Sequence, residues 1–222
     1  MSILDLPNVK ITDNDFGLQS NAIITRSIFN GRVTTAQRLG STWVGSYTVH
    51  GMKANSVEAR QWKSWLAQLD GASGRFYAFD PDIRTFSGTG NGTPVVNGVD
   101  QKGFSLITDG WDNSETVLLE GDYIEFNNEY HMVTADVTSD GSGNASISIA
   151  PEIRISPPDG EAVVITNPQG IFMLTEAPIW LSNKNKVITL TISFVEAFDY
   201  KTFLLTEAGD NLTTEADDRL IL

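Results

Sequence analysis

The sequence predicts a mainly β protein with one strong helix, and three observations support this prediction. Most of the chain alternates short β-branched or aromatic runs with turns rich in glycine and asparagine. One amphipathic segment, 56–70, has the period of a helix. A strand pattern at 186–196 needs a sheet to join, and the N-terminal part offers one. We therefore predict a discontinuous first domain, residues 1–84 and 167–200, with a second domain inserted at 85–166.

Composition limits the classes of function. The 222 residues are 41% hydrophobic, enough to build cores, and the net charge of −13 argues against a nucleic-acid clamp or a binder of anionic membranes. The absence of cysteine excludes disulfides, thiolate metal sites and cysteine nucleophiles. The N-terminus lacks the pattern of a signal peptide, and no apolar run approaches the roughly 18 residues of a spanning helix. We expect a protein made and folded in the cytoplasm, without membrane insertion.

The first domain begins with a hairpin and a tryptophan-centred strand. Asn30-Gly31 separates two Thr-rich or β-branched runs, 26–29 and 32–35, which is a strong short-range hairpin signal. The next strand is predicted over 43–49, with every second residue from its tryptophan on one face.

The helix that follows has a clear apolar face. Asn55 with Glu58 three residues later fits a capping box, and Gly71 stands where a left-handed C-terminal cap is wanted. Four large apolar side chains recur at helical spacing, so we expect that face to dock on the sheet. They are Trp62, Trp65, Leu66 and Leu69.

The inserted domain and the C-terminal extension complete the chain. Five or six short strands over roughly 80 residues predict a small barrel or sandwich. They are expected near 104–108, 116–119, 123–126, 130–137, 145–149 and 162–166. Beyond residue 200, an acidic extension at 201–222 carries a short echo, 206–212 matched by 214–220. It is interpreted either as a terminal hairpin or acidic tail, or as a strand that pairs with the edge of a neighbouring subunit.

Few residues of the sequence are candidates for a metal, phosphate or catalytic site. His50 and His131 stand in separate predicted domains, so a shared metal site would need an unexpected meeting, and we expect His131 at a solvent-facing strand position. The run 88–92 is rich in glycine but lacks the lysine of a phosphate-binding loop. We predict a linker there, no metal, no cofactor and no enzymatic activity.

Two pairs of acids are candidate glycosidase carboxylates. Asp80 with Asp82, and Glu120 with Asp122, each stand two residues apart, a spacing that fits turns better than paired catalytic groups. We expect turns at both places.

Two tryptophans outside the helix are candidate contacts for a glycan or a protein partner. Trp111 is expected in a polar loop and Trp180 follows a proline, and aromatic loop residues are common at interfaces. Local packing over the small barrel is the alternative for Trp111.

Several segments together resemble one protein family. The segments are 29–33, the tryptophan-centred strand at 43–49, 58–66, 71–80, 121–138 and 168–172. In them the chain resembles the distal tail proteins of long-tailed, non-contractile (siphovirus) bacteriophages, and the resemblance spans about residues 25–197.

The resemblance implies a fold and a role. It implies a β-sandwich or split-barrel ring-forming domain with one helix, and an inserted barrel similar to an oligonucleotide/oligosaccharide-binding (OB) fold that faces outward. Six copies would form a ring at the tail tip, joining the tail tube to the hub or tip protein, in a virion assembled in the host cytoplasm. A tape-measure protein and a host glycan are further candidate partners. A negative wall would also keep DNA from adhering as it leaves through the tail.

Two other classes of function remain as alternatives. One is a carbohydrate- or receptor-binding module used in host adsorption, which would grip its ligand with the inserted barrel and Trp111. The other is a glycan-degrading enzyme, against which stands the lack of a convergent histidine, cysteine or acid motif.

Overall fold

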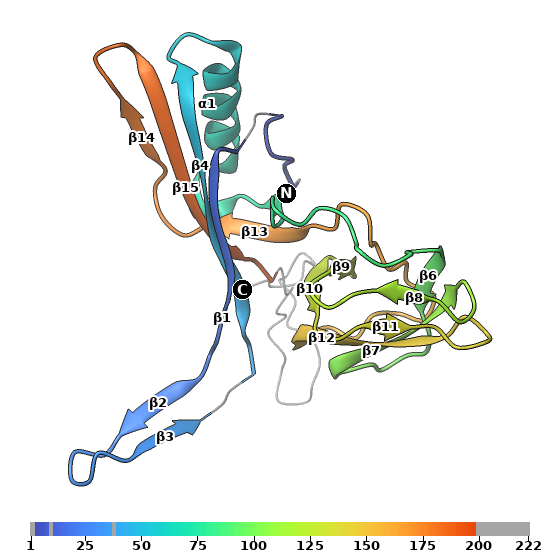
Figure 1. Ribbon diagram of the computed structural model, residues 1–222. Coiled ribbons are helices and arrows are strands. Elements are labelled where there is room, and N and C mark those ends of the chain that lie inside the picture. The colour runs from blue at the N-terminus through green and yellow to red at the C-terminus, as the bar shows by residue number, and fades with distance from the viewer. Residues whose placement is uncertain (1–2, 9–10, 37–38, 199–222) are drawn as a thin grey trace, which may run out of the picture.

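The computed structural model describes residues 3–8, 11–36 and 39–198, and this part of the chain is mainly β with one α-helix (Figure 1). The mainly β prediction is thereby confirmed. The predicted acidic extension, 201–222, lies outside the described residues.

The larger sheet joins strands from both ends of the described chain. Its strands follow the order β1-β4-β15-β13-β5, and β14 pairs with β15 beside β13. Their bounds are β1 Asp13–Gln19, β4 Thr42–Lys53, β5 Phe76–Ala78, β13 Gly170–Leu174, β14 Ile179–Ser182 and β15 Val187–Glu196. Strands that precede residue 79 and strands that follow residue 169 thus form one sheet.

The central strands of this sheet bury one face. In β15 every second side chain from Ile188 to Phe194 is at most 1% exposed, and the residues between them are only partly covered, as the period-2 pattern predicts. The buried ones are Ile188, Leu190, Ile192 and Phe194. In β4 the buried face carries Trp43, Tyr47 and Val49. These two strands form the floor of the first hydrophobic core.

Helix α1, Val57–Leu69, lies against β4 and covers this floor (Figure 1). On its apolar face, Trp62, Trp65 and Leu69 are buried. Leu66 is partly buried against the same cluster. Burial of such a stripe is what keeps a short helix folded.

The caps of α1 differ from the prediction. The Ser56 hydroxyl, not the Asn55 side chain, accepts the hydrogen bond from the backbone N–H of Ala59, because the helix begins one residue later than a cap at Asn55 requires. The left-handed conformation begins at Asp70 (φ 51°), one residue before Gly71 (φ 67°), and the short 3-10 helix η1, Gly71–Ser73, follows.

The second sheet is built from the middle of the chain, in the order β6-β7-β12-β10-β9. The bounds are β6 Gly92–Val96, β7 Gly103–Trp111, β9 Tyr123–Phe126, β10 Glu129–Val133 and β12 Ala145–Ile153. A small two-stranded sheet, β8 Thr116–Leu118 with β11 Val137–Thr138, shares its hydrophobic core.

One predicted strand of this unit is not a strand. The segment 162–166 pairs with β6 at one point and with β9 at another, so it forms no continuous ladder with either strand. The N–H of Val163 donates to the carbonyl of Pro94, and Val164 exchanges both backbone hydrogen bonds with Glu125. The segment therefore bridges the two edges of the five-stranded sheet.

The two sheets are joined by packing as well as by the chain. Tyr123 and Tyr130 come from the second sheet, yet their stacked rings belong to the first hydrophobic core. The Trp43 indole donates to the carbonyl of Tyr130 over 2.6 Å. The two connections between the sheets also pair with each other, through a bridge between Thr85 and Thr166. The middle unit is therefore held to the larger sheet over a broad contact.

Candidate functional site

A hairpin projects from the larger sheet beyond β1 and β4 (Figure 1). Its strands are β2, Ile23–Arg26, and β3, Val33–Ala36, and every residue of both strands is exposed. We call residues 23–36 the arm. The predicted turn is too short: the N–H of Gly31 donates to the carbonyl of Ser27, so the turn spans these residues and the first strand ends at Arg26.

The arm combines apolar and basic side chains. Ile28 and Phe29 at its tip are 91% and 94% exposed, and Ile24 along β2 is 71% exposed. The run 23–39 contains three arginines and no acidic residue, in a chain of net charge −13. Exposed apolar groups of this kind make the arm a candidate contact for a partner, because burial against a partner would remove them from water.

A buried charged cluster anchors the base of the arm to the second sheet. Arg154, at the end of β12, donates through Nη2 to the carbonyl of Ser41 and to Glu196 Oε2, the latter over 2.9 Å. The neighbouring Glu152 accepts a hydrogen bond from the N–H of Gly40. Three separate parts of the chain, the arm base, β12 and the end of β15, therefore meet at one arginine.

Glu196 and a further carboxylate, Glu129, complete this cluster by accepting backbone hydrogen bonds. Glu196 also accepts from the N–H of Trp43 over 3.1 Å, and burial raises its pKa to about 7 although Arg154 opposes the shift. Glu129 accepts from the backbone N–H groups of Arg154 and Ile155. Buried charges persist only when they are paired and hydrogen-bonded, as these are.

His131 lies next to this cluster, and our expectation of a solvent-facing position is wrong. The side chain is 0% exposed because β10 lies between β9 and β12, with the imidazole stacked on Phe126. Its Nδ1 lies 3.0 Å from the carbonyl of Pro151, so Nδ1 carries a proton. Its Nε2 lies 3.3 Å from Glu129 Oε2 without the alignment of a hydrogen bond.

The other histidine lies on the larger sheet. His50 is exposed on β4, with Nε2 2.8 Å from Asp13. The structure does not bring the two histidines together. In residues 3–8, 11–36 and 39–198, no group of three or more histidine or acidic side chains is arranged to hold a metal ion.

Both pairs of acids lie at turns, and one acid of each pair accepts a backbone hydrogen bond there. Asp80 accepts from the N–H of Asp82 and from the Tyr123 hydroxyl. Asp122 is 2% exposed and accepts from the N–H groups of Ser87 and Leu119. These carboxylates are used in positioning the backbone.

The two candidate contact tryptophans lie in different surroundings. Trp111 ends β7 and is 4% exposed, with its indole N–H donated to the Thr108 hydroxyl over 2.8 Å. This position fits the packing alternative, because a ligand would find little of the ring to touch. Trp180, on β14, is partly exposed and packs on the first core, with the Lys63 ammonium 5.0 Å from its ring centre.

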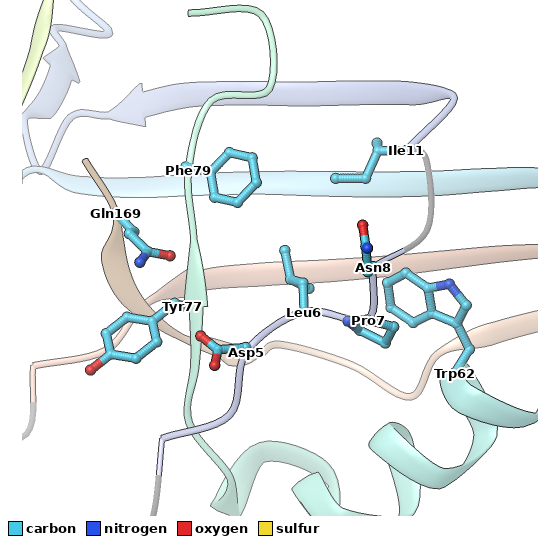
Figure 2. A pocket seen from close by; sticks show the side chains of 9 residues that line it. All are labelled: Asp5, Leu6, Pro7, Asn8, Ile11, Trp62, Tyr77, Phe79 and Gln169. Carbon is cyan, nitrogen blue, oxygen red and sulfur yellow. The ribbon is translucent and has the colours of Figure 1, made fainter. Parts of the chain in front are cut away.

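A cavity of about 300 Å³ lies beneath the N-terminal segment, beside α1 and β5 (Figure 2). Asp5, Tyr77 and Gln169 stand at one side of it and Trp62 at the other. Its nine lining residues include one carboxylate, Asp5, one phenol, Tyr77, and no histidine.

No protein-family model matches the chain, and no curated protein matches it. Among the described residues, no helix has the length and apolar character needed to cross a bilayer. The arm and the charged cluster at its base are therefore the features on which a functional proposal must rest.

Proposed function

We propose that this protein is a structural ring subunit of a siphovirus tail tip, a distal tail protein that joins the tail tube to the hub protein. The observation that carries the proposal is the arm. Its tip exposes Ile28 and Phe29 almost fully, and it carries positive charge on an acidic chain. A second copy of the chain offers the opposite charge, which favours self-association.

The family resemblance supplies the viral context of this proposal. The segments that carry it contribute the tip of the arm, part of strand β4, helix α1, strand β5, the hairpin of β9 with β10, and strand β13. These elements all belong to the arm, to the larger sheet with its helix, or to the middle unit docked on it.

We also propose that the larger sheet is the ring-forming sandwich or split barrel, and that the middle unit is an OB-like barrel. Support for the second assignment comes from the five-stranded antiparallel sheet and from the segment 162–166, which bridges its edge strands β6 and β9. In an assembled ring this unit would be free to face outward and contact neighbouring tail proteins.

Electron microscopy of the purified protein over a concentration series, with light-scattering masses on the same samples, tests the proposal. We expect six-fold rings whose fraction rises with concentration. The variant Ile28→Ser/Phe29→Ser should keep the thermal midpoint of the wild type, because both residues are exposed, but remain monomeric.

The matched control is Val99→Ser, which removes an exposed apolar side chain (68% exposed) from the middle unit and should leave assembly unchanged. Monomers of the wild type at every concentration, or rings that form equally well without the arm's apolar tip, would contradict the proposal.

A further inference from the structure

A second cavity, of about 500 Å³, lies at the base of the arm. We call it the base cavity. Its lining includes Leu39, Gly40, Glu152, Ile153, Arg154 and Phe198. It therefore combines apolar walls with the charged cluster that anchors the arm.

The lining of the base cavity suits an apolar side chain that has basic residues beside it. Leu39 is 70% exposed at its edge. The Arg154 side chain is 6% exposed, yet its Nε is buried without a hydrogen-bond partner among the described residues. Glu152 lines the cavity and two further carboxylates, Glu129 and Glu196, lie against Arg154, so acids outnumber the arginine here.

We propose that the arm tip of one copy, Ile28 and Phe29, inserts into the base cavity of the next copy around the ring. The inference rests on the proposed ring function and names the acceptor of the arm. The apolar tip matches the walls formed by Ile153 and Phe198, and the arginines of the arm match the surplus of carboxylates.

The contact must be between two copies. The arm points away from the body (Figure 1). The base cavity is lined by Leu39 and Gly40, which follow the arm at the end opposite its tip, so tip and cavity of the same chain lie apart. A surface patch that binds a different patch on an identical neighbour is a heterologous contact, and such contacts close into rings when the rotation between copies permits. The same contact repeated six times would account for a hexamer.

The absence of cysteine from the chain allows a direct test by disulfide trapping. The variant Phe29→Cys/Leu39→Cys is first checked for wild-type oligomer mass under reducing conditions and then oxidised. We expect a ladder of covalent oligomers on a denaturing gel, at least about tenfold stronger than for the control Phe29→Cys/Val99→Cys, because a bound neighbour raises the local thiol concentration.

A second variant covers the case in which the first one fails to assemble. Asn30→Cys/Thr42→Cys keeps Ile28, Phe29 and Leu39, and places thiols beside the tip and in the lining of the cavity. The same ladder is expected from it.

Each result is decisive. A ladder specific to the paired positions, and lost on reduction, supports the inference. Wild-type-like rings without a ladder from either variant overturn it and leave the proposed function standing. A wild type that never forms oligomers overturns both.

Discussion

Arg154 and Glu196 show how single residues connect distant parts of this chain. The pair is 42 residues apart in sequence and almost fully buried, with side chains 6% and 2% exposed. The same guanidinium holds the carbonyl of Ser41 at the base of the arm. Removal of one partner would leave the other as an uncompensated buried charge, which is far more costly than loss of the whole pair.

Glu196 should make stability depend on pH. Its pKa in the folded chain is about 7, above its ordinary value of 4.5, so the folded state binds the proton more tightly than the unfolded state. The stability contributed by this proton is present at pH 4.5 and is lost as pH rises towards 7, by at most about 1.4 kcal/mol per pH unit. Urea unfolding of the wild type and of Glu196→Gln at several pH values measures it.

Over this window the wild type should lose stability relative to Glu196→Gln. Glu176→Gln, at an exposed position, should run parallel to the wild type. A constant difference between the wild type and Glu196→Gln from pH 5 to pH 7 would contradict the assignment.

At the scale of elements, α1 is the lid of the first core. Trp62 is 1% exposed, and its ring stands 5.3 Å from that of Trp65, which in turn packs edge-on against Phe76 of β5. The helix thereby ties β4 to the opposite edge of the sheet.

Truncation of this contact should destabilise the whole protein. Trp62→Ala is expected to lower the free energy of unfolding by about 3–5 kcal/mol, because it removes a large buried ring and leaves a cavity. Gln61→Ala, on the exposed face of the same helix, should change it by less than about 0.5 kcal/mol. Denaturant titrations followed by tryptophan fluorescence and by circular dichroism measure both, and equal effects would show that the helix is not docked as described.

The elements also show how far the sequence predicts this fold. The strands predicted at 123–126 and 186–196 lie within one residue of the observed bounds, because the apolar side chains of these segments follow the burial pattern of a strand. Strand β1 was missed because Asp13–Gln19 has no β-branched residue, and its pairing with β4 decides its conformation. A local sequence pattern does not predict pairing between segments that are distant in the sequence.

The candidate site was less accessible to sequence reasoning. The hairpin was predicted from Asn30-Gly31, but its full exposure depends on the path of the strands on either side of it. The burial of His131 and Glu129 depends on neighbouring strands and on backbone donors at Arg154 and Ile155, about 25 residues away. One local signal was available: a run of 17 residues, 23–39, with three arginines and no acid in an acidic chain.

For the whole molecule, the contrast between a basic arm and an acidic body should make assembly sensitive to salt. An increase in ionic strength from about 0.1 M to about 1 M shortens the screening length from about 10 Å to about 3 Å. We expect a smaller assembled fraction at the same protein concentration, measured by light scattering.

The variant Arg26→Gln/Arg32→Gln is the control for this effect, because both side chains lie on the arm. Its assembly should be weaker at low salt and less dependent on salt than that of the wild type. An assembled fraction that rises with salt would show that apolar contacts alone hold the copies together.

The pairing of Thr85 with Thr166 has a consequence for how such a chain could evolve. Because the middle unit leaves and rejoins the larger sheet at neighbouring points, a short loop could replace all of it without moving either flank. Such a replacement would also remove Tyr123 and Tyr130, and the loss of their rings would leave a cavity in the first hydrophobic core. A graft at this position should therefore succeed only if the incoming module brings two aromatic rings to the same place, or if Trp43 is replaced together with it.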